Sequence, residues 1–272
     1  FVGVGSDDVL SMCFLTFFNG KKPVLFPDIT YSFYSVWADL YRIPYEKQKL
    51  DDNMKIVPED YYKENGGVIF PNPNAPTGLL MDLDSVRDII EHNNDVVVIV
   101  DEAYIDFGGV SAKDLVNEYD NVLVVQTFSK SRSMAGMRIG YAFGSKELIK
   151  ALNDVKFSFN SYTMNMTSID MGVASINDKK YFEECVERIT ATRERTKEEL
   201  TKLGFTFPDS KANFIFATHK SVPAKEIFEK LKDLNIFVRY FAQPGIDNYL
   251  RITIGTDEQM DKLISALSEI VG

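Results

Sequence analysis

The chain alternates short, continuous apolar runs with longer stretches in which apolar residues recur every three or four positions. The short runs are rich in valine and isoleucine, which predicts strands that are buried on both faces of a sheet. They lie at residues 1–5, 23–26, 67–70, 96–100, 121–126 and 138–143. The longer stretches predict amphipathic helices at residues 7–18, 31–41 and 83–92. Strands that alternate with helices are typical of an α/β fold with a doubly wound, mostly parallel sheet.

The last third of the chain follows a different order. Apolar positions at helical spacing predict one long helix over residues 180–203, which Gly204 ends. Two further helices are expected, one near Pro223 and one after a capping box formed by Thr256 and Gln259. Strands are predicted at residues 213–217, 236–240 and 249–255. We therefore expect a large domain over residues 1–182 and a smaller α+β domain over residues 183–272.

Composition narrows the class of protein. The 272 residues carry a formal net charge of -10, whereas nucleic-acid-binding proteins usually present a basic patch, so no nucleic-acid partner is expected. Cys13 and Cys185 lack a neighbouring cysteine or histidine cluster, which predicts free thiols in a reducing compartment and no metal site. No apolar run approaches the ~18 residues of a membrane span. We therefore expect a cytoplasmic protein with no membrane partner and no signal peptide. Because Phe1 falls within a strand pattern, we also expect a further N-terminal segment.

Polar residues follow two of the buried strands, at the edge where ligands bind in doubly wound sheets. Asp101 ends the run at 96–100, and Ser129 and Lys130 follow the run at 121–126. A lysine in a water-poor site loses its proton readily and can attack a carbonyl carbon. The helix that begins after Gly5 offers free N–H groups to an anion such as phosphate. Lys130 therefore suits an aldehyde, Asp101 suits a ring nitrogen that carries a proton, and the helix start suits a phosphate. Pyridoxal phosphate carries all three groups and is the expected cofactor.

Five stretches carry a resemblance to a known family: "GSDD", "PNPNAPTG", "VDEAYIDF", "TFSKSRSMAGMRIGYA" and "LRITIGT". In this order they resemble the serial motifs of the fold-type-I pyridoxal-phosphate aminotransferases, and the resemblance covers essentially the whole chain. Within that family the chain is most similar to the histidinol-phosphate aminotransferases. The resemblance implies exchange of an amino group between L-glutamate or 2-oxoglutarate and histidinol phosphate or imidazole-acetol phosphate, in histidine biosynthesis. It also implies a homodimer, because related sites lie at the subunit interface.

The resemblance implies a role for each matching residue. Lys130 forms the internal Schiff base and later moves the proton between substrate and cofactor, Asp101 pairs with the pyridinium nitrogen, and Tyr104 donates to the phenolic oxygen. Tyr31 stacks on the ring. N–H, hydroxyl and guanidinium groups hold the phosphate, from Ser6, Asp7, Thr127, Ser129 and Arg138.

Two arginines and one loop complete the implied site. Arg251 matches the residue that clamps the glutamate carboxylate, and Arg239 matches a second contact for an anion. The family loop has an asparagine directly before "PTG", where this chain has Ala75. Either Asn74 substitutes for that asparagine, or Tyr104 alone contacts the phenolic oxygen.

The sequence alone leaves several other hypotheses open. Within the family, an aromatic amino acid transaminase and a threonine-phosphate decarboxylase use the same scaffold. A different class is a non-catalytic, ligand-sensing domain of a transcription regulator built on this fold. The chain could also be a fragment that folds but is inactive without its N-terminal segment.

Overall fold

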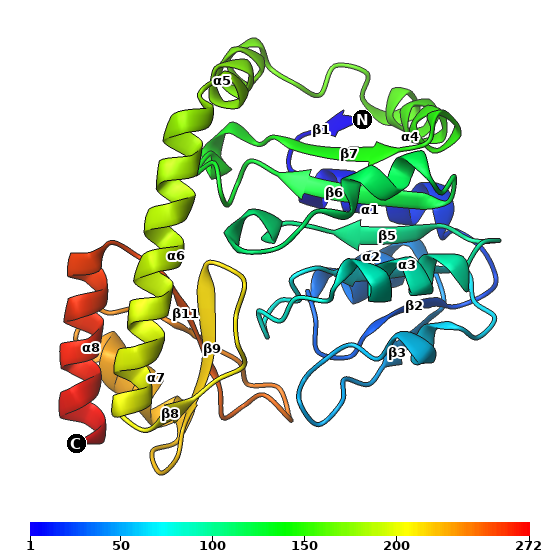
Figure 1. Cartoon of the computed structure of the whole chain (residues 1–272). Coiled ribbons are helices and arrows are strands. Elements are labelled where there is room, and N and C mark those ends of the chain that lie inside the picture. The colour runs from blue at the N-terminus through cyan, green and yellow to red at the C-terminus, as the bar shows by residue number, and fades with distance from the viewer.

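The computed structural model describes residues 1–272, which form two sheets with helices around them (Figure 1). The larger sheet has seven strands in the order β1-β7-β6-β5-β4-β2-β3. Strands β3, β2, β4, β5 and β6 are mutually parallel, whereas β7 is antiparallel to both β6 and β1, so the predicted mostly parallel sheet is confirmed. Its strands are β1 (Val2–Gly3), β2 (Val24–Pro27), β3 (Tyr45–Gln48), β4 (Gly67–Pro71), β5 (Val98–Asp101), β6 (Val122–Thr127) and β7 (Gly140–Gly144).

Helices cover both faces of this sheet. One face packs on α1 (Ser6–Phe17), α2 (Phe33–Tyr41) and α4 (Lys146–Phe159), and the other packs on α3 (Leu83–Glu91), η1 (Pro58–Tyr61) and η3 (Ala112–Asn117). Side chains alternate between these two cores along β5, with Ile99 on the α1 face and Val98 and Val100 on the α3 face. The same alternation directs Asp101, the last residue of β5, to the face of α1 and α2.

The four-stranded sheet has the order β10-β11-β9-β8 and packs on three helices. Its core contains apolar residues of every one of these helices. The capping box of Thr256 and Gln259 is present at the start of α8, as the sequence predicts. The strands are β8 (Phe205–Thr206), β9 (Phe214–His219), β10 (Arg239–Tyr240) and β11 (Leu250–Thr253), and the helices are α6 (Lys179–Lys202), α7 (Ala224–Asp233) and α8 (Asp257–Val271).

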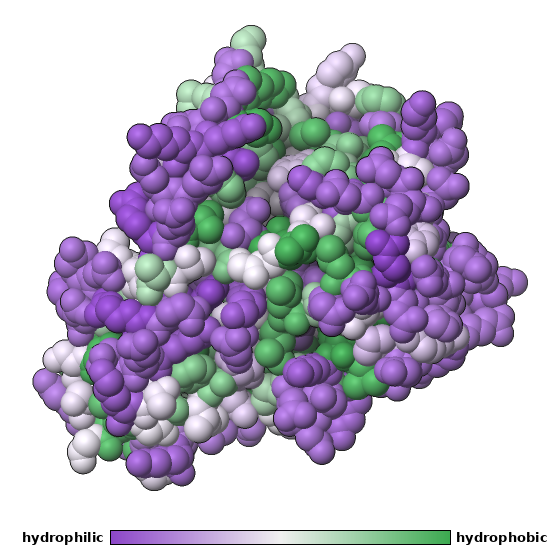
Figure 2. All heavy atoms as spheres, viewed as in Figure 1, coloured by the Kyte–Doolittle hydropathy of each residue, from purple (hydrophilic) through white to green (hydrophobic).

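Helix α6 connects the two parts of the molecule (Figure 1). It begins beside α5 (Met166–Asn177) near the larger sheet and ends beside the smaller one. On the face seen in Figure 2, hydrophilic residues cover most of the surface and apolar residues gather toward the middle. None of the helices combines the length and the apolar character that a membrane span requires. The predicted domain boundary at residue 182 falls in the first turn of α6 and stays a prediction.

Two local features differ from what the sequence pattern predicts. Of the strand expected at residues 236–240, only Arg239 and Tyr240 are paired, as β10. The charged run at residues 194–199 has the composition of a solvated helix face, yet Lys197 within it is buried. Its ammonium group lies 2.7 Å from Asp209 Oδ1 and donates to the carbonyl of Ser210 at 3.1 Å. These partners offset the cost of removing the charge from water.

Arg193, one turn earlier on α6, is buried in the same way. Its Nη1 donates to the carbonyl of Phe107 at 2.8 Å and to the carbonyl of Ala212 at 2.9 Å. Phe107 ends η2 (Ile105–Phe107), which follows β5 of the larger sheet, and Ala212 precedes β9 of the smaller one. The buried guanidinium of Arg193 therefore connects the two parts of the chain.

Candidate active site

A cavity of about 190 Å³ lies where β5 and β6 end. Because parallel strands end at the same edge of a sheet, residues far apart in the sequence meet there. Eight of the twelve residues predicted for the site line it, together with apolar and small side chains. They are Ser6, Asp7, Tyr31, Asp101, Tyr104, Ser129, Lys130 and Arg138.

Asp101 is the buried acid of this cavity, with 4% of its surface exposed. Oδ2 of its carboxylate accepts a hydrogen bond of 2.7 Å from the hydroxyl of Tyr34, and Oδ1 accepts one of 3.3 Å from the N–H of Ala103. Burial raises the pKa of Asp101 to about 6, because a carboxylate loses its hydration there, and the two hydrogen bonds oppose that rise. Asp101 is therefore a carboxylate that an adjacent cation would stabilise.

Lys130 brings the only primary amine of the cavity. Its Nζ lies 5.4 Å from the centre of the Tyr104 ring and forms no ion pair. The Tyr104 ring packs edge-on against Phe214 of β9, with ring centres 5.0 Å apart. The smaller sheet thus helps to form the wall against which the amine lies, and the amine itself stays free for a carbonyl carbon.

An anion site is built at the N-terminus of α1. Gly5 precedes the helix with a φ of 102°, and a Cβ at this position would lie 2.3 Å from Nη2 of Arg138. Glycine is therefore required for the guanidinium to lie against the helix terminus. No side chain caps the first N–H groups of α1, so these groups and Arg138 are available to a phosphate.

These features together match the groups of pyridoxal phosphate. The cavity offers a free amine, a buried carboxylate and a cationic helix terminus, which suit an aldehyde, a ring nitrogen and a phosphate. The Tyr31 ring lines the cavity, and its hydroxyl donates to Asp7 Oδ1 at 2.9 Å, which fixes the ring. The residues present therefore fit this cofactor.

Arg239 and Arg251 line a second cavity of about 450 Å³, which shares Tyr31 and Ala75 with the first. The two arginines are partners in the antiparallel pair of β10 and β11. The guanidinium of Arg251 lies 5.2 Å from the centre of the Phe214 ring, and its buried Nε has no hydrogen-bond partner. An unpaired, buried donor beside a second arginine is suited to an anionic group of a substrate.

Two of the residues predicted to contact the cofactor, Asn74 and Thr127, do not line the first cavity. Both N–H groups of the Asn74 amide are used, by the carbonyl of Ile29 at 3.0 Å and by Thr77 Oγ1 at 3.3 Å. Asn74 consequently fastens two loops and does not line the cavity, whereas Ala75 does. Thr127 donates to the carbonyl of Ile139 at 3.3 Å and accepts from the N–H of Ser129. Its hydroxyl therefore shapes the turn before Lys130, and its role as a phosphate contact stays a prediction.

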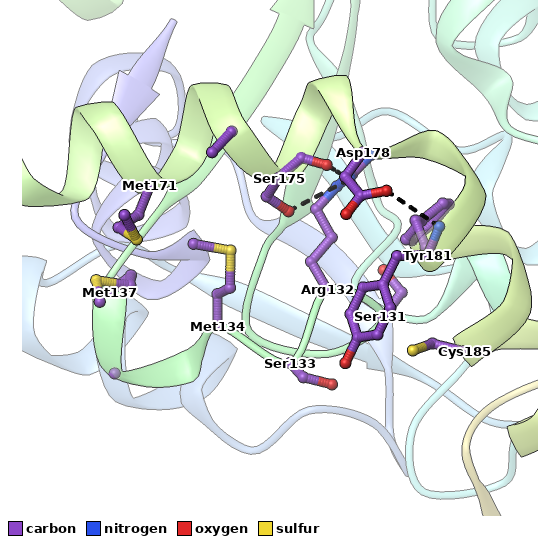
Figure 3. A pocket seen from close by; sticks show the side chains of 13 residues that line it. Ser131, Arg132, Ser133, Met134, Met137, Met171, Ser175, Asp178, Tyr181 and Cys185 are labelled. Atoms are coloured by element: carbon purple, nitrogen blue, oxygen red, sulfur yellow. Dashed lines mark hydrogen bonds between the residues drawn. The ribbon is translucent and has the colours of Figure 1, made fainter.

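A third cavity, of about 550 Å³, lies away from these residues, between the segment 131–137, α5 and the start of α6 (Figure 3). Arg132 crosses it, with its guanidinium 5.2 Å and 4.2 Å from the ring centres of Phe128 and Phe182. Nη1 of Arg132 donates to the carbonyl of Ser175 at 2.8 Å. No residue predicted for the site lines this cavity, and its arginine is engaged in packing.

Comparison with known proteins places the chain in a family. The sequence profile of the aminotransferases of class I and II matches residues 1–267. The chain belongs to this family. A histidinol-phosphate aminotransferase from Clostridium beijerinckii is 53% identical over 271 residues, which are 100% of this chain and 76% of that protein. This membership confirms the expected enzyme class and the expected cofactor, pyridoxal phosphate.

Solved structures show the same fold. The histidinol-phosphate aminotransferase from Clostridium acetobutylicum has a TM-score of 0.91 at 24% identity and covers 99% of this chain and 83% of its own. The enzyme of that name from Sinorhizobium meliloti, in complex with pyridoxal-5'-phosphate, has a TM-score of 0.90 at 21% identity. The match covers 99% of this chain and 76% of that one. At such identities the likeness establishes the fold, which agrees with the predicted class.

Sequence reasoning missed one polar contact of the site. Tyr34 lies three residues after Tyr31, at the start of α2, and its hydroxyl reaches Asp101. The spacing of three was visible and places both rings on one side of a helical turn. Nothing in the local sequence indicated which strand end that side would face.

Proposed function

We propose that this aminotransferase exchanges an amino group between L-glutamate or 2-oxoglutarate and histidinol phosphate or imidazole-acetol phosphate, in histidine biosynthesis. The observation that carries the proposal is the 53% identity, over the whole chain, to a relative that bears this activity in its name. The two arginines beside the cofactor cavity support it, because each of these substrates carries an anionic end.

Each residue of the first cavity has a separate proposed role toward the cofactor. When bound, pyridoxal phosphate supplies an electron sink for the electrons left on the substrate carbon after its proton is removed. Lys130 would hold the cofactor through its amine, and the same amine would take the proton from the substrate α-carbon as a general base. Asp101 would keep the ring nitrogen of the bound cofactor protonated, and the Tyr104 hydroxyl would donate to its phenolic oxygen. Arg138 and the N-terminus of α1 bind the phosphate.

The second cavity provides for the substrate. Arg251 binds the carboxylate of glutamate, and Arg239 adds a second positive charge for the phosphate of the alternative substrate. Tyr31, Tyr240 and Phe241 line the same cavity and offer aromatic faces to an imidazole ring. Because one pair of arginines serves either anion, both half-reactions can use one site.

Turnover of different donors by the complete protein tests the proposal. We expect histidinol phosphate to turn over with 2-oxoglutarate. The values of kcat/KM for phenylalanine and threonine phosphate are expected to be at least about a hundredfold lower.

Replacing Arg251 by alanine is expected to raise the KM of both glutamate and histidinol phosphate about 10- to 100-fold, because a charge-assisted hydrogen bond is lost. Arg188→Ala, on the exposed side of α6, is the matched control and leaves both values unchanged.

Each of the alternatives gives a distinct result. Release of carbon dioxide from threonine phosphate as the only reaction would replace the transaminase proposal by a decarboxylase. A preference for phenylalanine would make the protein an aromatic amino acid transaminase. Cofactor binding without turnover of any donor would favour a ligand-sensing domain.

We also propose that the protein acts as a homodimer. Helix α5 exposes an apolar stripe at positions three or four residues apart, and large exposed apolar patches mark interaction surfaces. The stripe consists of Met166, Ile169, Val173 and Ile176. Helix α2 exposes a second apolar group, which consists of Phe33, Val36 and Leu40.

We propose in addition that the protein is located in the cytoplasm. Cys13 and Cys185 are both free thiols, as is usual in a reducing compartment.

Charged substitutions in the α5 stripe test the dimer. We expect the double variant Ile169→Asp, Val173→Asp to raise the dimer dissociation constant at least about tenfold, because two carboxylates would be buried without partners. Sedimentation equilibrium of the complete protein measures the constant, with the exposed Asp170→Ala on the same helix as control. A wild-type protein that is monomeric at micromolar concentration would reject the proposal.

A further inference from the structure

A tyrosine of α2 lies directly behind the carboxylate of the candidate site. Tyr34 is completely buried, and its hydroxyl donates to Asp101 Oδ2 at 2.7 Å. The other oxygen, Oδ1, accepts only the longer bond of 3.3 Å from Ala103. Tyr34 thus makes the shorter of the two hydrogen bonds that fix the plane of the carboxylate.

The ring of Tyr34 cannot swing away from this position, because aromatic side chains enclose it. Ring centres of four neighbours lie within 5.7–6.3 Å of its own, in stacked, tilted and edge-on arrangements. The neighbours are Phe14 of α1, Phe26 of β2, Tyr31, and Trp37 of α2. Since such close packing restricts rotation, the hydroxyl is a donor with a fixed direction.

Apart from the hydrogen bonds of Tyr34 and Ala103 and the charge of Lys130, the surroundings of Asp101 favour the neutral acid. Burial removes hydration from the carboxylate, and the nearby Asp7 carboxylate and Cys13 thiol, both on α1, add no positive charge. Lys130 is the cation that acts on Asp101, and its electrostatic effect is smaller than the hydrogen bond from Tyr34. A neutral carboxylic acid cannot pair with a protonated ring nitrogen, so a donor to the ionised form is needed.

We propose that Tyr34 is a positioning residue that keeps the Asp101 carboxylate ionised and directed at the ring nitrogen of pyridoxal phosphate. The proposal rests on the role given to Asp101 under the proposed function. Tyr34 acts through Asp101 and has no part in the covalent chemistry. Its hydrogen bond favours the arrangement in which the shared proton lies on the ring nitrogen over the one in which it lies on Asp101.

The test uses the complete holoenzyme loaded with ¹⁵N-labelled cofactor. We expect Tyr34→Phe at pH 7.5 to move the ¹⁵N resonance of the ring toward the value of an unprotonated pyridine. The same change is expected to weaken cofactor binding about tenfold and to lower kcat about 10- to 100-fold with little change in KM, the range for a hydrogen bond to a charged group. A merely structural role of the hydroxyl would not move the ¹⁵N resonance.

Tyr61→Phe is the matched control. Tyr61 is also almost fully buried, on the opposite face of the sheet, and its hydroxyl has no hydrogen-bond partner. We expect this variant to keep the wild-type resonance, affinity and kcat. If Tyr34→Phe does not fold, site-specific replacement Tyr34→3-fluorotyrosine keeps the ring and makes the hydroxyl a stronger donor. The ¹⁵N resonance is then expected to move in the opposite direction.

The outcomes separate this proposal from the one on which it rests. A folded Tyr34→Phe with the wild-type resonance and affinity, or a fluorotyrosine variant with no shift, overturns the role of Tyr34. A ring nitrogen that is unprotonated in the wild type, or unaffected by Asp101→Asn, overturns instead the role of Asp101. Loss of turnover of every donor with a normal resonance would count against the proposed reaction and leave Tyr34 in place.

Discussion

Lys130→Ala is expected to lower kcat for transamination by at least about a thousandfold. The variant loses the only primary amine that lines the cavity. With it go the covalent hold on the cofactor and the base for the substrate proton that we propose for Lys130. General acid–base catalysis alone contributes about 10²- to 10⁴-fold. Single-turnover measurements with the loaded enzyme and glutamate report the step directly, because they exclude later product release.

Two further variants separate chemistry from charge in this experiment. Lys130→Arg keeps the positive charge, but a guanidinium does not lose its proton, so we expect it to be as inactive as the alanine variant. Lys113→Ala, at an exposed position of η3, is expected to behave as wild type. Partial recovery of Lys130→Ala by an added small primary amine would support the role in proton transfer. Retention of more than a tenth of the wild-type kcat by Lys130→Ala would contradict it.

Asp101→Asn is expected to have opposite effects on activity and on stability. An amide cannot hold a proton on the ring nitrogen, so kcat should fall at least about a hundredfold. In the cofactor-free protein, by contrast, the variant should be more stable than wild type at pH 8, by about 2–3 kcal/mol for a shift of roughly two pKa units. The gain arises because asparagine avoids burying a negative charge.

The sign of the pH dependence follows from the raised pKa of Asp101. Burial moves it from 3.8 to about 6, so the folded state binds the proton more tightly than the unfolded state does. The resulting stability is complete below pH 3.8 and is lost as the pH rises through 6. The difference between Asp101→Asn and wild type should therefore grow across this window and stay constant above it.

Urea unfolding of the cofactor-free proteins at pH 4 and pH 8 measures this difference. Asp52→Asn, in an exposed loop, is the control and should change the free energy of unfolding by the same small amount at both values. Equal stability of Asp101→Asn and wild type at pH 8 would show that burial of this carboxylate carries no cost. That result would contradict the raised pKa of Asp101.

Local sequence patterns predict most strands of the larger sheet. The apolar runs at 67–70, 96–100 and 121–126 predict β4, β5 and β6, because strands covered on both faces need continuous apolar sequence. Strand β3, with the sequence Tyr-Glu-Lys-Gln, lies at the edge of the sheet and pairs on one side only. An edge strand tolerates charged side chains, so its sequence carries no such pattern.

The candidate site divides in the same way. Asp101, Ser129 and Lys130 follow buried strands, and the rule that ligands bind at the carboxyl ends of parallel strands brings them together without any structure. Asn74 and Thr127 have suitable chemistry, but their hydrogen-bonding groups are used within the loops. The direction of a polar side chain depends on neighbours that local sequence does not specify.

By itself, the sequence determined most strands of the larger sheet and the family, and it predicted the amine and the acid of the cavity. Only the tertiary structure decided that Tyr34 donates to Asp101, 67 residues away, and that Arg193 donates to Phe107, 86 residues away. Periodicity reflects which face of an element is buried, and that is a local property. Hydrogen-bond partners across such distances depend on how finished elements pack, which no short stretch of residues encodes.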